Sequence, residues 1–539
     1  MLNIQNLQIG FPEQQAVRGI SFCLQRGELL GIVGESGSGK SLTAMSILQL
    51  QAPNAQISGK ILFQETDLTQ LSEEGMRAYR GKRISIVFQE PMSSLNPVFS
   101  CGKQVVEAIL VHQKVSKALA KEQALAWFRR VHLQDSERIF QSYPHQLSGG
   151  QKQRVMIAMA MCCEPDVLIA DEPTTALDVN VQAEILNLLK SLQVEKKLSI
   201  LFISHDLSVV QHIADRVLVM RNGEIVERGE TVQIFKQPQH QYTKQLLAAR
   251  PPMDKKLHRL PSTENNFEEK IITESRLSSS EALLRVQGLH TWYSKKENWW
   301  GKTTKYTKAV KDVSFELKSG QTLGLVGESG SGKSSIGRSI LRLTPARSGE
   351  IWFKGKNLLQ LSNAQMRAVR KDIQIIFQDP TSTLNPRLKI GEAITEPILV
   401  HRLAKNKADA KLKAIRLLEK VGLEATHFDR YPSQFSGGQR QRIAIARALA
   451  PEPQLIICDE CVSSLDVSVQ AQVLNLLKDL QEEFQLSYLF ISHDLAVVRF
   501  MSDTIVVLKD GQIVEQAAVN QLFELPQMDY TKTLINAKI

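Results

Sequence analysis

The stretch Gly34-Glu-Ser-Gly-Ser-Gly-Lys40-Ser41 decides how the rest of the sequence is interpreted. It recurs without change, roughly 290 residues further along the chain, as Gly327-Glu-Ser-Gly-Ser-Gly-Lys333-Ser334. Each copy follows a short apolar run, Leu29 to Val33 in the first and Thr322 to Val326 in the second. A buried strand that leads into a Gly-rich turn and then a helix is typical of a βαβ unit. The sequence therefore predicts an α/β fold that occurs twice.

Later segments recur in the same order, so the duplication covers whole domains. The paired segments are Phe88-Gln89 with Phe377-Gln378, Ser148 to Gln151 with Ser436 to Gln439, Asp171-Glu172 with Asp459-Glu460, and Ile203 to Leu207 with Ile491 to Leu495. Between the copies, residues 251–281 hold Pro-Pro and polar runs without apolar periodicity, which indicates a flexible linker. We expect one domain at 1–250, a linker at 251–281 and a second domain at 282–539.

Each copy has the same coarse pattern of secondary structure. Apolar runs such as Val167 to Ala170 and Ile200 to Ile203 indicate buried parallel strands. Asn222-Gly223 and Asp510-Gly511 are typical of type I′ hairpin turns. Apolar residues at helical spacing predict a helical insert in each copy; they are Ala124, Trp127, Phe128 and Val131, then Ala414, Leu417, Leu418 and Val421.

The overall composition limits the class of protein. With 43% hydrophobic and 23% charged residues, the chain is globular, and its apolar runs are too short to span a membrane. The N-terminus lacks the pattern of a secretion signal, so we expect the protein to stay in the cytosol. The net charge of +10 comes from interspersed acidic and basic residues, which indicates a solvated surface and no nucleic-acid partner. The six cysteines lie largely in apolar stretches, as reduced core cysteines do.

The repeated octapeptide has the form of a P-loop, the phosphate-binding turn of many nucleotide-binding proteins. Its glycines let backbone N–H groups surround the phosphates, its lysine reaches the β- and γ-oxygens, and the following serine ligates Mg²⁺. The predicted nucleotide-binding residues are Gly34, Glu35, Ser36, Gly37, Ser38, Gly39, Lys40 and Ser41, and then Gly327, Glu328, Ser329, Gly330, Ser331, Gly332, Lys333 and Ser334.

An Asp-Glu pair ends an apolar strand in each copy. Asp171 and Asp459 are placed to hold the metal, and the adjacent Glu172 and Glu460 to orient and deprotonate the attacking water. A chance Asp-Glu at a strand end is common, but its order after a P-loop favours a catalytic role.

A Ser-Gly-Gly-Gln segment opens a predicted helix in each copy. Hydroxyl groups, bare backbone N–H groups and the positive end of a helix dipole together suit a phosphate, whereas a lone copy would also fit a surface turn. The residues are Ser148, Gly149, Gly150 and Gln151, and then Ser436, Gly437, Gly438 and Gln439.

This order of motifs resembles the nucleotide-binding domains of ABC transporters, over nearly the whole chain outside the linker. The resemblance implies two tandem P-loop NTPase domains, each with a RecA-like α/β core, an antiparallel β subdomain and a helical insert. It also implies that ATP lies between the P-loop of one domain and the Ser-Gly-Gly-Gln signature of the other, with Mg²⁺. By the same resemblance Gln89 and Gln378 contact the metal and water, His205 and His493 contact the γ-phosphate, and Asp178 and Asp466 belong to the loop that joins the two sites.

An aromatic residue upstream of each P-loop is expected to stack on the adenine. Phe11 is the candidate in the first domain, and Tyr293 in the second, where an insertion that carries Trp299, Trp300 and Tyr306 complicates the choice.

Finer features are similar to the oligopeptide/dipeptide/nickel importer branch. They are Glu90 to Pro97, Asp379 to Pro386, and the tails Gln241 to Leu247 and Asp529 to Leu534; the fused format resembles importers of microcin C, other peptides and glutathione. The resemblance implies an ATPase at the cytoplasmic face of the inner membrane, two transmembrane permease subunits, and an extracytoplasmic solute-binding protein. It leaves open whether the solute is a peptide, glutathione, nickel or another small compound.

The chain departs from the pattern of this branch at two places, both of which concern cysteine. Many members of the branch carry a cysteine cluster after the Tyr-Thr-Lys tail, but no cysteine follows Cys461, so we predict no iron–sulfur centre. Cys461 itself stands where the first domain has Pro173, and loss of that φ restraint predicts a looser Glu460. The alternative is a tandem ABC protein that acts on ribosomes, which would call for a long charged helical arm in place of the Pro- and Ser-interrupted linker.

Overall fold

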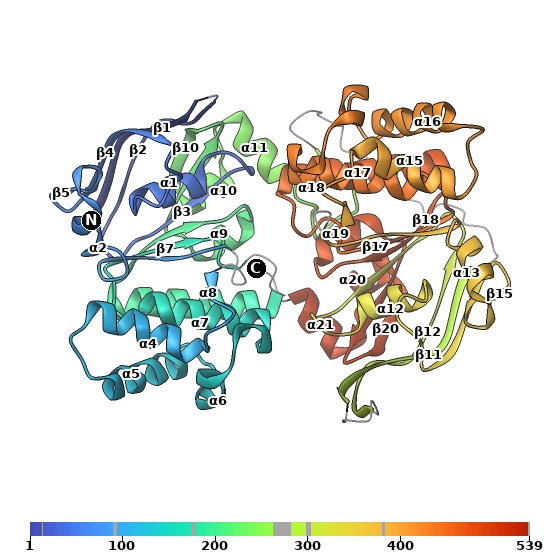
Figure 1. The fold of residues 1–539 in the computed structure, drawn as a ribbon, viewed down its shortest axis with the longest axis horizontal. Coiled ribbons are helices and arrows are strands. Elements are labelled where there is room, and N and C mark those ends of the chain that lie inside the picture. Colours follow the sequence, from blue (N-terminus) through green and yellow to red (C-terminus); the bar gives the residue numbers. More distant parts are fainter. Residues whose placement is uncertain are drawn as a thin grey trace. The chain divides into compact units, whose positions relative to one another are not determined.

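The computed structural model describes residues 1–12, 14–89, 94–174, 179–261, 282–297, 303–379 and 383–536. The chain divides between Leu247 and Ala248 into two compact units, here called the first half and the second half. Both halves have the predicted α/β architecture, drawn in Figure 1. No helix in the described ranges has both the length and the apolar character that a membrane span requires.

The first half contains two sheets. A four-stranded antiparallel sheet has the order β2-β1-β4-β5, and a six-stranded sheet has the order β10-β9-β3-β8-β7-β6. In the second sheet all neighbours are parallel except β9 and β10. The strands are β1 (Leu2–Phe11), β2 (Gln14–Leu24), β3 (Leu29–Val33), β4 (Gln56–Phe63), β5 (Thr66–Asp67), β6 (Ile84–Val87), β7 (Val167–Asp171), β8 (Ser199–Ile203), β9 (Arg216–Arg221) and β10 (Glu224–Glu230).

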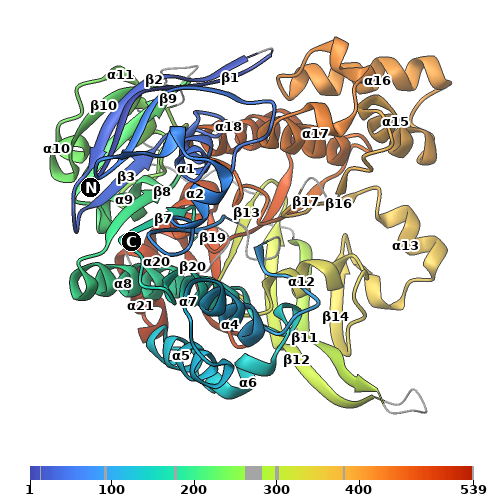
Figure 2. The same cartoon turned by 60° about the vertical axis from the view of Figure 1, so that its left-hand side comes forward.

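The helices of the first half include the predicted insert. Ala124, Trp127 and Phe128 lie in α5 and are buried, and the helix ends one residue before the buried Val131. Figures 1 and 2 show α4, α5 and α6 grouped at the end of this half that lies away from β1 and β2. The helices are α1 (Lys40–Ile47), α2 (Glu73–Arg77), α4 (Cys101–His112), α5 (Lys117–Arg130), α6 (Ser136–Gln141), α7 (Gly149–Met161), α8 (Val179–Lys196), α9 (Leu207–Ile213), α10 (Thr231–Lys236) and α11 (Gln241–Ala248).

The second half repeats both sheets. Their strand orders are β12-β11-β14-β15 and β16-β17-β18-β13-β19-β20, with antiparallel pairing in the first sheet and between β19 and β20. The strands are β11 (Ala282–Glu297), β12 (Thr303–Lys318), β13 (Thr322–Val326), β14 (Ser348–Phe353), β15 (Lys356–Asn357), β16 (Ile373–Ile376), β17 (Leu455–Asp459), β18 (Ser487–Ile491), β19 (Thr504–Lys509) and β20 (Gln512–Ala518).

The helical insert recurs in the second half, with Ala414 and Leu418 buried on α16. The helices are α12 (Lys333–Ile340), α13 (Asn363–Val369), α15 (Ile390–Val400), α16 (Lys407–Lys420), α17 (Gly437–Leu449), α18 (Val467–Phe484), α19 (Leu495–Met501), α20 (Val519–Glu524) and α21 (Asp529–Asn536). Both predicted hairpins are confirmed, because Asn222 and Gly223 have φ of 48° and 83°, and Asp510 and Gly511 have 49° and 82°. Positive φ at both central residues is what a type I′ turn requires.

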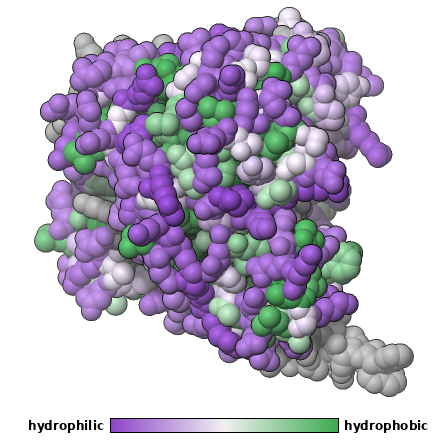
Figure 3. Space-filling view, turned by 90° about the vertical axis from the view of Figure 1, so that its left-hand side faces the viewer, coloured by the Kyte–Doolittle hydropathy of each residue, from purple (hydrophilic) through white to green (hydrophobic). Residues whose placement is uncertain are grey.

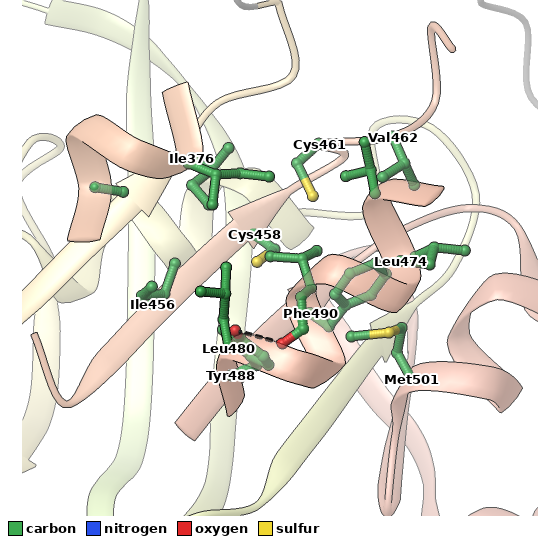
Figure 4. Packing of buried hydrophobic residues seen from close by; sticks show 14 of the residues in the cluster. Ile376, Ile456, Cys458, Cys461, Val462, Leu474, Leu480, Tyr488, Phe490 and Met501 are labelled. Carbon is green, nitrogen blue, oxygen red and sulfur yellow. Dashed lines mark hydrogen bonds between the residues drawn. The ribbon is translucent and has the colours of Figure 1, made fainter. Parts of the chain in front are cut away.

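The cores explain where the cysteines lie. Cys458 and Cys461 are buried in the second half among Ile376, Leu474 and Phe490, as Figure 4 shows. A hydrogen bond with Cys461 and burial both raise the pKa of the Cys458 thiol. The prediction of core placement is wrong for Cys23, which is exposed, because alternate residues of β2 point away from the core.

The surface is mainly polar. The face in Figure 3 is dominated by hydrophilic residues, and the hydrophobic ones occur in small groups. Exposed apolar residues of this kind are usual on globular proteins.

The structure differs from the sequence prediction over residues 251–261, which are packed rather than flexible. Residues 249–260, here called the strap, lie against the second half, with Ala249, Leu257 and Leu260 buried in its hydrophobic core. The segment has too few apolar residues to show a helical or strand period, so its sequence pattern is that of a linker. The remainder of the predicted linker, 262–281, lies outside the described residues.

Polar contacts fix the strap to two helices. The Asn475 side chain on α18 bonds both backbone groups of Leu260, with N–H···Oδ1 at 2.9 Å and Nδ2–H···O at 2.8 Å. The Arg259 guanidinium lies 2.6 Å from the Asp479 carboxylate. On α19, Arg499 donates to the carbonyl oxygens of Met253 and Asp254. Because these bonds satisfy backbone groups that burial would otherwise leave unpaired, the strap is an integral part of the second half.

We expect Leu260→Ala to destabilise the second half by about 2–4 kcal/mol, since it removes a fully buried side chain and leaves a cavity. Calorimetric unfolding of the full chain would show one transition lowered in temperature. Asp254→Ala is the matched control, because that side chain is exposed and its carbonyl contact with Arg499 is retained. Equal melting of the two variants would contradict the packed strap.

Candidate active sites

Each P-loop is shaped by glycines between a buried strand and a helix. In the first half it links β3 to α1, and Gly34 and Gly39 have φ of 151° and 99°. A Cβ on Gly34 would lie 2.2 Å from the carbonyl oxygen of Met220. Gly327 and Gly332 repeat these values at 150° and 101°. Glycine is therefore required for both conformation and space.

The P-loop lysines are buried inside their own loops. Lys40 is 5% exposed, and its ammonium donates to the carbonyl oxygens of Gly34 at 2.7 Å and Glu35 at 2.8 Å. Lys333 makes the matching bonds to Gly327 and Glu328, again at 2.7 and 2.8 Å. A buried ammonium needs such acceptors. The charge is thus held at the centre of the turn, where phosphate oxygens would bind.

The serine after each lysine meets the aspartate at the end of the neighbouring Asp-Glu strand. Ser41 Oγ lies 3.0 Å from Asp171 Oδ1, and Ser334 Oγ lies 2.6 Å from Asp459 Oδ1. Burial raises the pKa of Asp171 to about 6, against the opposing effect of the Ser41 hydrogen bond, and burial likewise raises the pKa of Asp459. A bound cation would reverse this shift and keep the carboxylates ionised.

These donors fit a magnesium ion. A hydroxyl and a carboxylate oxygen are hard ligands, and Mg²⁺ commonly takes one or two carboxylates together with substrate phosphates. Within the described ranges no group of three or more His, Cys, Asp or Glu is arranged to hold a metal.

Glu172 is fixed at the carboxyl end of β7 by its backbone and by two side chains. Its φ is 48°, and its N–H donates to the Ile203 carbonyl at 2.9 Å. Gln89 Nε2 donates to Glu172 Oε2 at 2.8 Å, and His205 Nδ1 lies 2.9 Å from the same oxygen. The structure thus brings together three residues that the sequence places on separate segments.

Glu460 has the same backbone placement in spite of Cys461. Its φ is 50° and its N–H donates to Ile491 at 3.0 Å, so the proline at the following position is not needed for this conformation. The side-chain contact is longer, with His493 Nδ1 at 3.4 Å from Glu460 Oε1. Gln378 lines a cavity of about 820 Å³ that also reaches Asp459. The two glutamates therefore share one backbone conformation, and a looser Glu460 stays a prediction.

The histidines and glutamates form partly buried pairs, which become ion pairs when the histidine is protonated. Burial lowers the pKa of His205, but the hydrogen bond and charge of Glu172 outweigh it, so the pKa lies above its usual value. The same balance, with Glu460, raises the pKa of His493. Burial acts to raise the pKa of Glu460, while His493 and Lys333 outweigh it and lower the pKa.

The Ser-Gly-Gly-Gln segments open helices as predicted. Ser148 caps α7: its Oγ accepts from Gln151 N at 3.3 Å, and Gln151 Oε1 accepts from Ser148 N at 3.1 Å. Ser436 and Gln439 make the same capping box on α17. Gly149 and Gly437 are the first residues of the two helices. The serine and the first glycine of each segment are exposed, and the N–H groups lie at a helix N-terminus.

The second glycine of each segment has a packing role. A Cβ on Gly150 would lie 2.6 Å from Val181 Cγ1, and one on Gly438 would lie 2.3 Å from Val469 Cγ1. The helix that follows the Asp-Glu strand therefore packs too closely for any side chain here.

The adenine-stacking candidates stay predictions. Phe11 ends β1 and pairs with Gln14, while Tyr293 on β11 is 37% exposed and its hydroxyl lies 3.1 Å from Ser335 Oγ, one residue past the P-loop serine. Asp466 caps α18 by accepting from Val469 N at 3.0 Å. Asp178, Glu90 to Ser93, Pro380 to Ser382, Trp299 and Trp300 lie outside the described residues.

A tyrosine in each tail lies beside a P-loop residue, and in the first half it bonds the loop, which the sequence pattern does not predict. Tyr242 is fully buried on α11, and its hydroxyl accepts from the Glu35 N–H at 3.2 Å. Tyr530 lies beside Glu328 in the second half, and burial raises its pKa to about 12. The Tyr-Thr-Lys repeat in both tails was the available signal, but a contact across 207 residues has no local pattern.

Together these features define two P-loop nucleotide-binding domains, each with a buried lysine, a serine–aspartate pair and a glutamate held by histidine. Residues 17–175 and 310–463 match the ABC transporter family, and residues 226–272 match the C-terminal region of oligopeptide/dipeptide transporters. The chain belongs to the ABC transporter family and carries two of its ATPase domains.

Two curated relatives agree with this placement. The glutathione import ATP-binding protein GsiA of Shigella boydii serotype 4 (strain Sb227) is 50% identical over 556 residues, covering 100% of this chain and 89% of the relative. GsiA of Escherichia coli (strain K12) is 49% identical with the same coverage. A dimeric post-hydrolysis structure of the ATP-binding cassette MJ0796 with ADP and phosphate is 29% identical, covers 44% of this chain and 98% of that chain, and has a TM-score of 0.40.

We expect Glu172→Gln with Glu460→Gln to lower ATP turnover at least about 100-fold, because the amide cannot take a proton from water. ATP binding should be retained, since the lysine and serine contacts are untouched. Filter binding and phosphate release measure the two properties separately. Each single variant serves as a control for the other half, and normal turnover by the double variant would refute the assignment.

The histidine–glutamate pairs predict a pH dependence. Because the pKa of folded His205 is raised, the stabilisation from its pair with Glu172 is complete below the unfolded value of about 6.5 and is lost as the pH rises through the folded pKa. We expect Glu172→Gln to lower the pKa of His205 and leave that of His493 unchanged, with Glu460→Gln giving the reverse. NMR titration of the imidazole carbon-bound protons tests this, and a common shift of both histidines would argue against the pairing.

Proposed function

We propose that this chain is the ATP-hydrolysing subunit of an importer that takes up glutathione or other short peptides through separate membrane subunits. Two observations support the proposal: the full-length likeness to glutathione import ATP-binding proteins, and the match of residues 226–272 to oligopeptide/dipeptide transporters. Glutathione is itself a short peptide, so both point to one class of solute. Nickel is the less favoured alternative.

The position of Glu172 is the main support for a hydrolytic role. Its carboxylate contacts the side chains of both Gln89 and His205. Lys40 binds phosphate oxygens once ATP displaces the loop carbonyls from its ammonium. Glu172 then orients the attacking water and takes its proton, and His205 contacts the terminal phosphate. The second half uses Lys333, Glu460 and His493 in the same way, with Gln378 in the place of Gln89.

Ser41 with Asp171, and Ser334 with Asp459, would hold a magnesium ion, which when bound would neutralise charge on the phosphates. The serine hydroxyls and buried aspartates hold their oxygens within 3.0 Å of one another in both halves, ready to share a cation. By resemblance to the family, the signature segments Ser148–Gln151 and Ser436–Gln439 would each complete a nucleotide site with the other domain's P-loop.

Membrane association is proposed to use apolar residues on the helical inserts. Val111, near the end of α4, is 70% exposed, and Val400, at the matching end of α15, is 63% exposed. Val400 also lines the cavity that holds Gln378, so this surface adjoins the hydrolytic site of its half. Two such surfaces suit a pair of permease subunits on the cytoplasmic face of the membrane, with an extracytoplasmic solute-binding protein delivering the solute.

The test replaces the chain in its own cell and measures uptake of labelled glutathione, a labelled dipeptide and nickel. Lys40→Ala with Lys333→Ala should reduce peptide uptake to background, because both phosphate-binding cations are gone. Nickel uptake should be unchanged. Val111→Asp with Val400→Asp should release the chain from the membrane fraction and also stop uptake, while the purified protein still binds ATP.

The two double variants test the solute and the membrane attachment separately. If the lysine variant lost nickel uptake and kept peptide uptake, the solute would be nickel and not a peptide. Release of the lysine variant from membranes would show that attachment depends on nucleotide binding. Sedimentation of the wild-type chain with ribosomes instead of membranes would overturn the transport role.

A further inference from the structure

A cavity of about 480 Å³ lies in the first half, away from the P-loop. It is bordered by the end of α4, by α5 and by the segment that follows α7, and among the groups lining it are Gln113, Gln123, Arg130, Cys162 and Cys163. Cavities of this size hold small molecules. None of these residues has a role in the nucleotide site described above.

Two thiols from adjacent residues reach this cavity. The sulfur atoms of Cys162 and Cys163 are 4.0 Å apart. Cys162 is buried, while Cys163 is only partly so. The Cys162 thiol donates to the Met159 carbonyl oxygen at 3.1 Å, and the Cys163 thiol donates to the Ala108 carbonyl oxygen at 3.7 Å. The contact with Cys162 lowers the pKa of the Cys163 thiol; burial opposes this shift, and Gln113 and the charge of Lys82 add to it.

Gln123, which lines the cavity, carries an unused acceptor. Gln123 Oε1 is buried and has no hydrogen-bond partner among the residues that the structure describes. An unpaired buried oxygen costs roughly 1–3 kcal/mol, which a ligand with an N–H group would recover. Arg130 adds a cation at the rim, where it pairs with Glu195 and lies over the Trp127 ring at 5.1 Å from the ring centroid. Amide, carboxylate and sulfur groups on one ligand would all find partners here.

The second half has no counterpart to the two thiols. Ala450 and Pro451 occupy the equivalent positions after α17. The cysteines are therefore not needed by the fold of an ATPase domain. They stand at the end of α7 opposite the Ser148 cap, about 20 Å away at the rise of a helix of this length.

We propose that Cys163 is a modification site, at which the cavity binds a small peptide disulfide and forms a mixed disulfide with it. Cys163 Sγ attacks one sulfur of the disulfide, and a bond forms between them as the original S–S bond breaks. The leaving sulfur departs as a thiolate with the bonding electron pair and takes up a proton. The disulfide is the oxidant, and a free thiol reverses the step. Gln123 positions the peptide, and Cys162 supports the attacking sulfur.

The test treats the purified, reduced full chain with glutathione disulfide at pH 7 and follows each cysteine by peptide mass spectrometry. Cys163 should gain a glutathionyl group at least about fivefold faster than the exposed Cys23, and dithiothreitol should remove it. A bulky maleimide should show the opposite order, because it reaches Cys23 but not the cavity. No permease or solute uptake is involved, so the result is independent of the transport role.

Matched variants distinguish a binding site from a merely reactive thiol. Gln123→Leu should slow glutathionylation of Cys163 about threefold or more and leave its reaction with iodoacetamide unchanged. Cys162→Ala should slow both reactions, whereas Cys162→Ser keeps a donor and should restore them. Unchanged ATP turnover and melting confirm that each variant is folded.

The proposal is overturned if Cys163 reacts no faster than Cys23 with glutathione disulfide. It is equally overturned if Gln123→Leu slows the reactions of Cys163 with glutathione disulfide and with iodoacetamide to the same extent. The cavity would then affect only the access of reagents to the thiol.

Discussion

Charged side chains are buried at the carboxyl edge of each six-stranded sheet, and the arrangement of the surrounding elements depends on how these charges are paired. Lys40, Asp171 and Glu172 are each less than a tenth exposed, and a charge taken out of water must be paired or hydrogen-bonded. The lysine is paired by the carbonyls of its own loop, the aspartate by Ser41 and the glutamate by His205. The glycines, the strand ends and the helix starts are placed by these requirements.

The same constraint explains why the second site tolerates Cys461. Glu172 and Glu460 both take a positive φ, which is unfavourable for a residue with a side chain. In both halves one backbone hydrogen bond to the neighbouring strand holds the glutamate in this conformation. The sheet therefore already restrains the glutamate backbone, and the ring of Pro173 only adds to this restraint. The two halves differ in the distance between the histidine and the glutamate.

The sequence predicts features that are marked by a pattern within one short segment. It does not predict features that depend on contacts between distant segments. The strands before the P-loops were correct to the residue, because an apolar run bounded by Gly-rich turns leaves little freedom in where it ends. The strap was missed because only Leu257 and Leu260 mark it, and their partners lie more than 200 residues away. Tyr242 was noted as part of a repeated tail, but its bond to the P-loop depends on tertiary structure alone.

These two missed features are joined by the chain itself. Tyr242 contacts the first P-loop from α11, α11 ends at Ala248, and the strap that begins one residue later binds α18 and α19 of the second half. The helix α19 follows His493 directly, and Arg499 on it holds two strap carbonyls. The chain therefore passes directly from the helix that contacts the first P-loop into the segment that packs within the second half. Within the second half, His493 contacts Glu460 just before α19 begins, and Arg499 further along α19 holds the strap. This short helix therefore links the strap to the Asp-Glu strand of its own half.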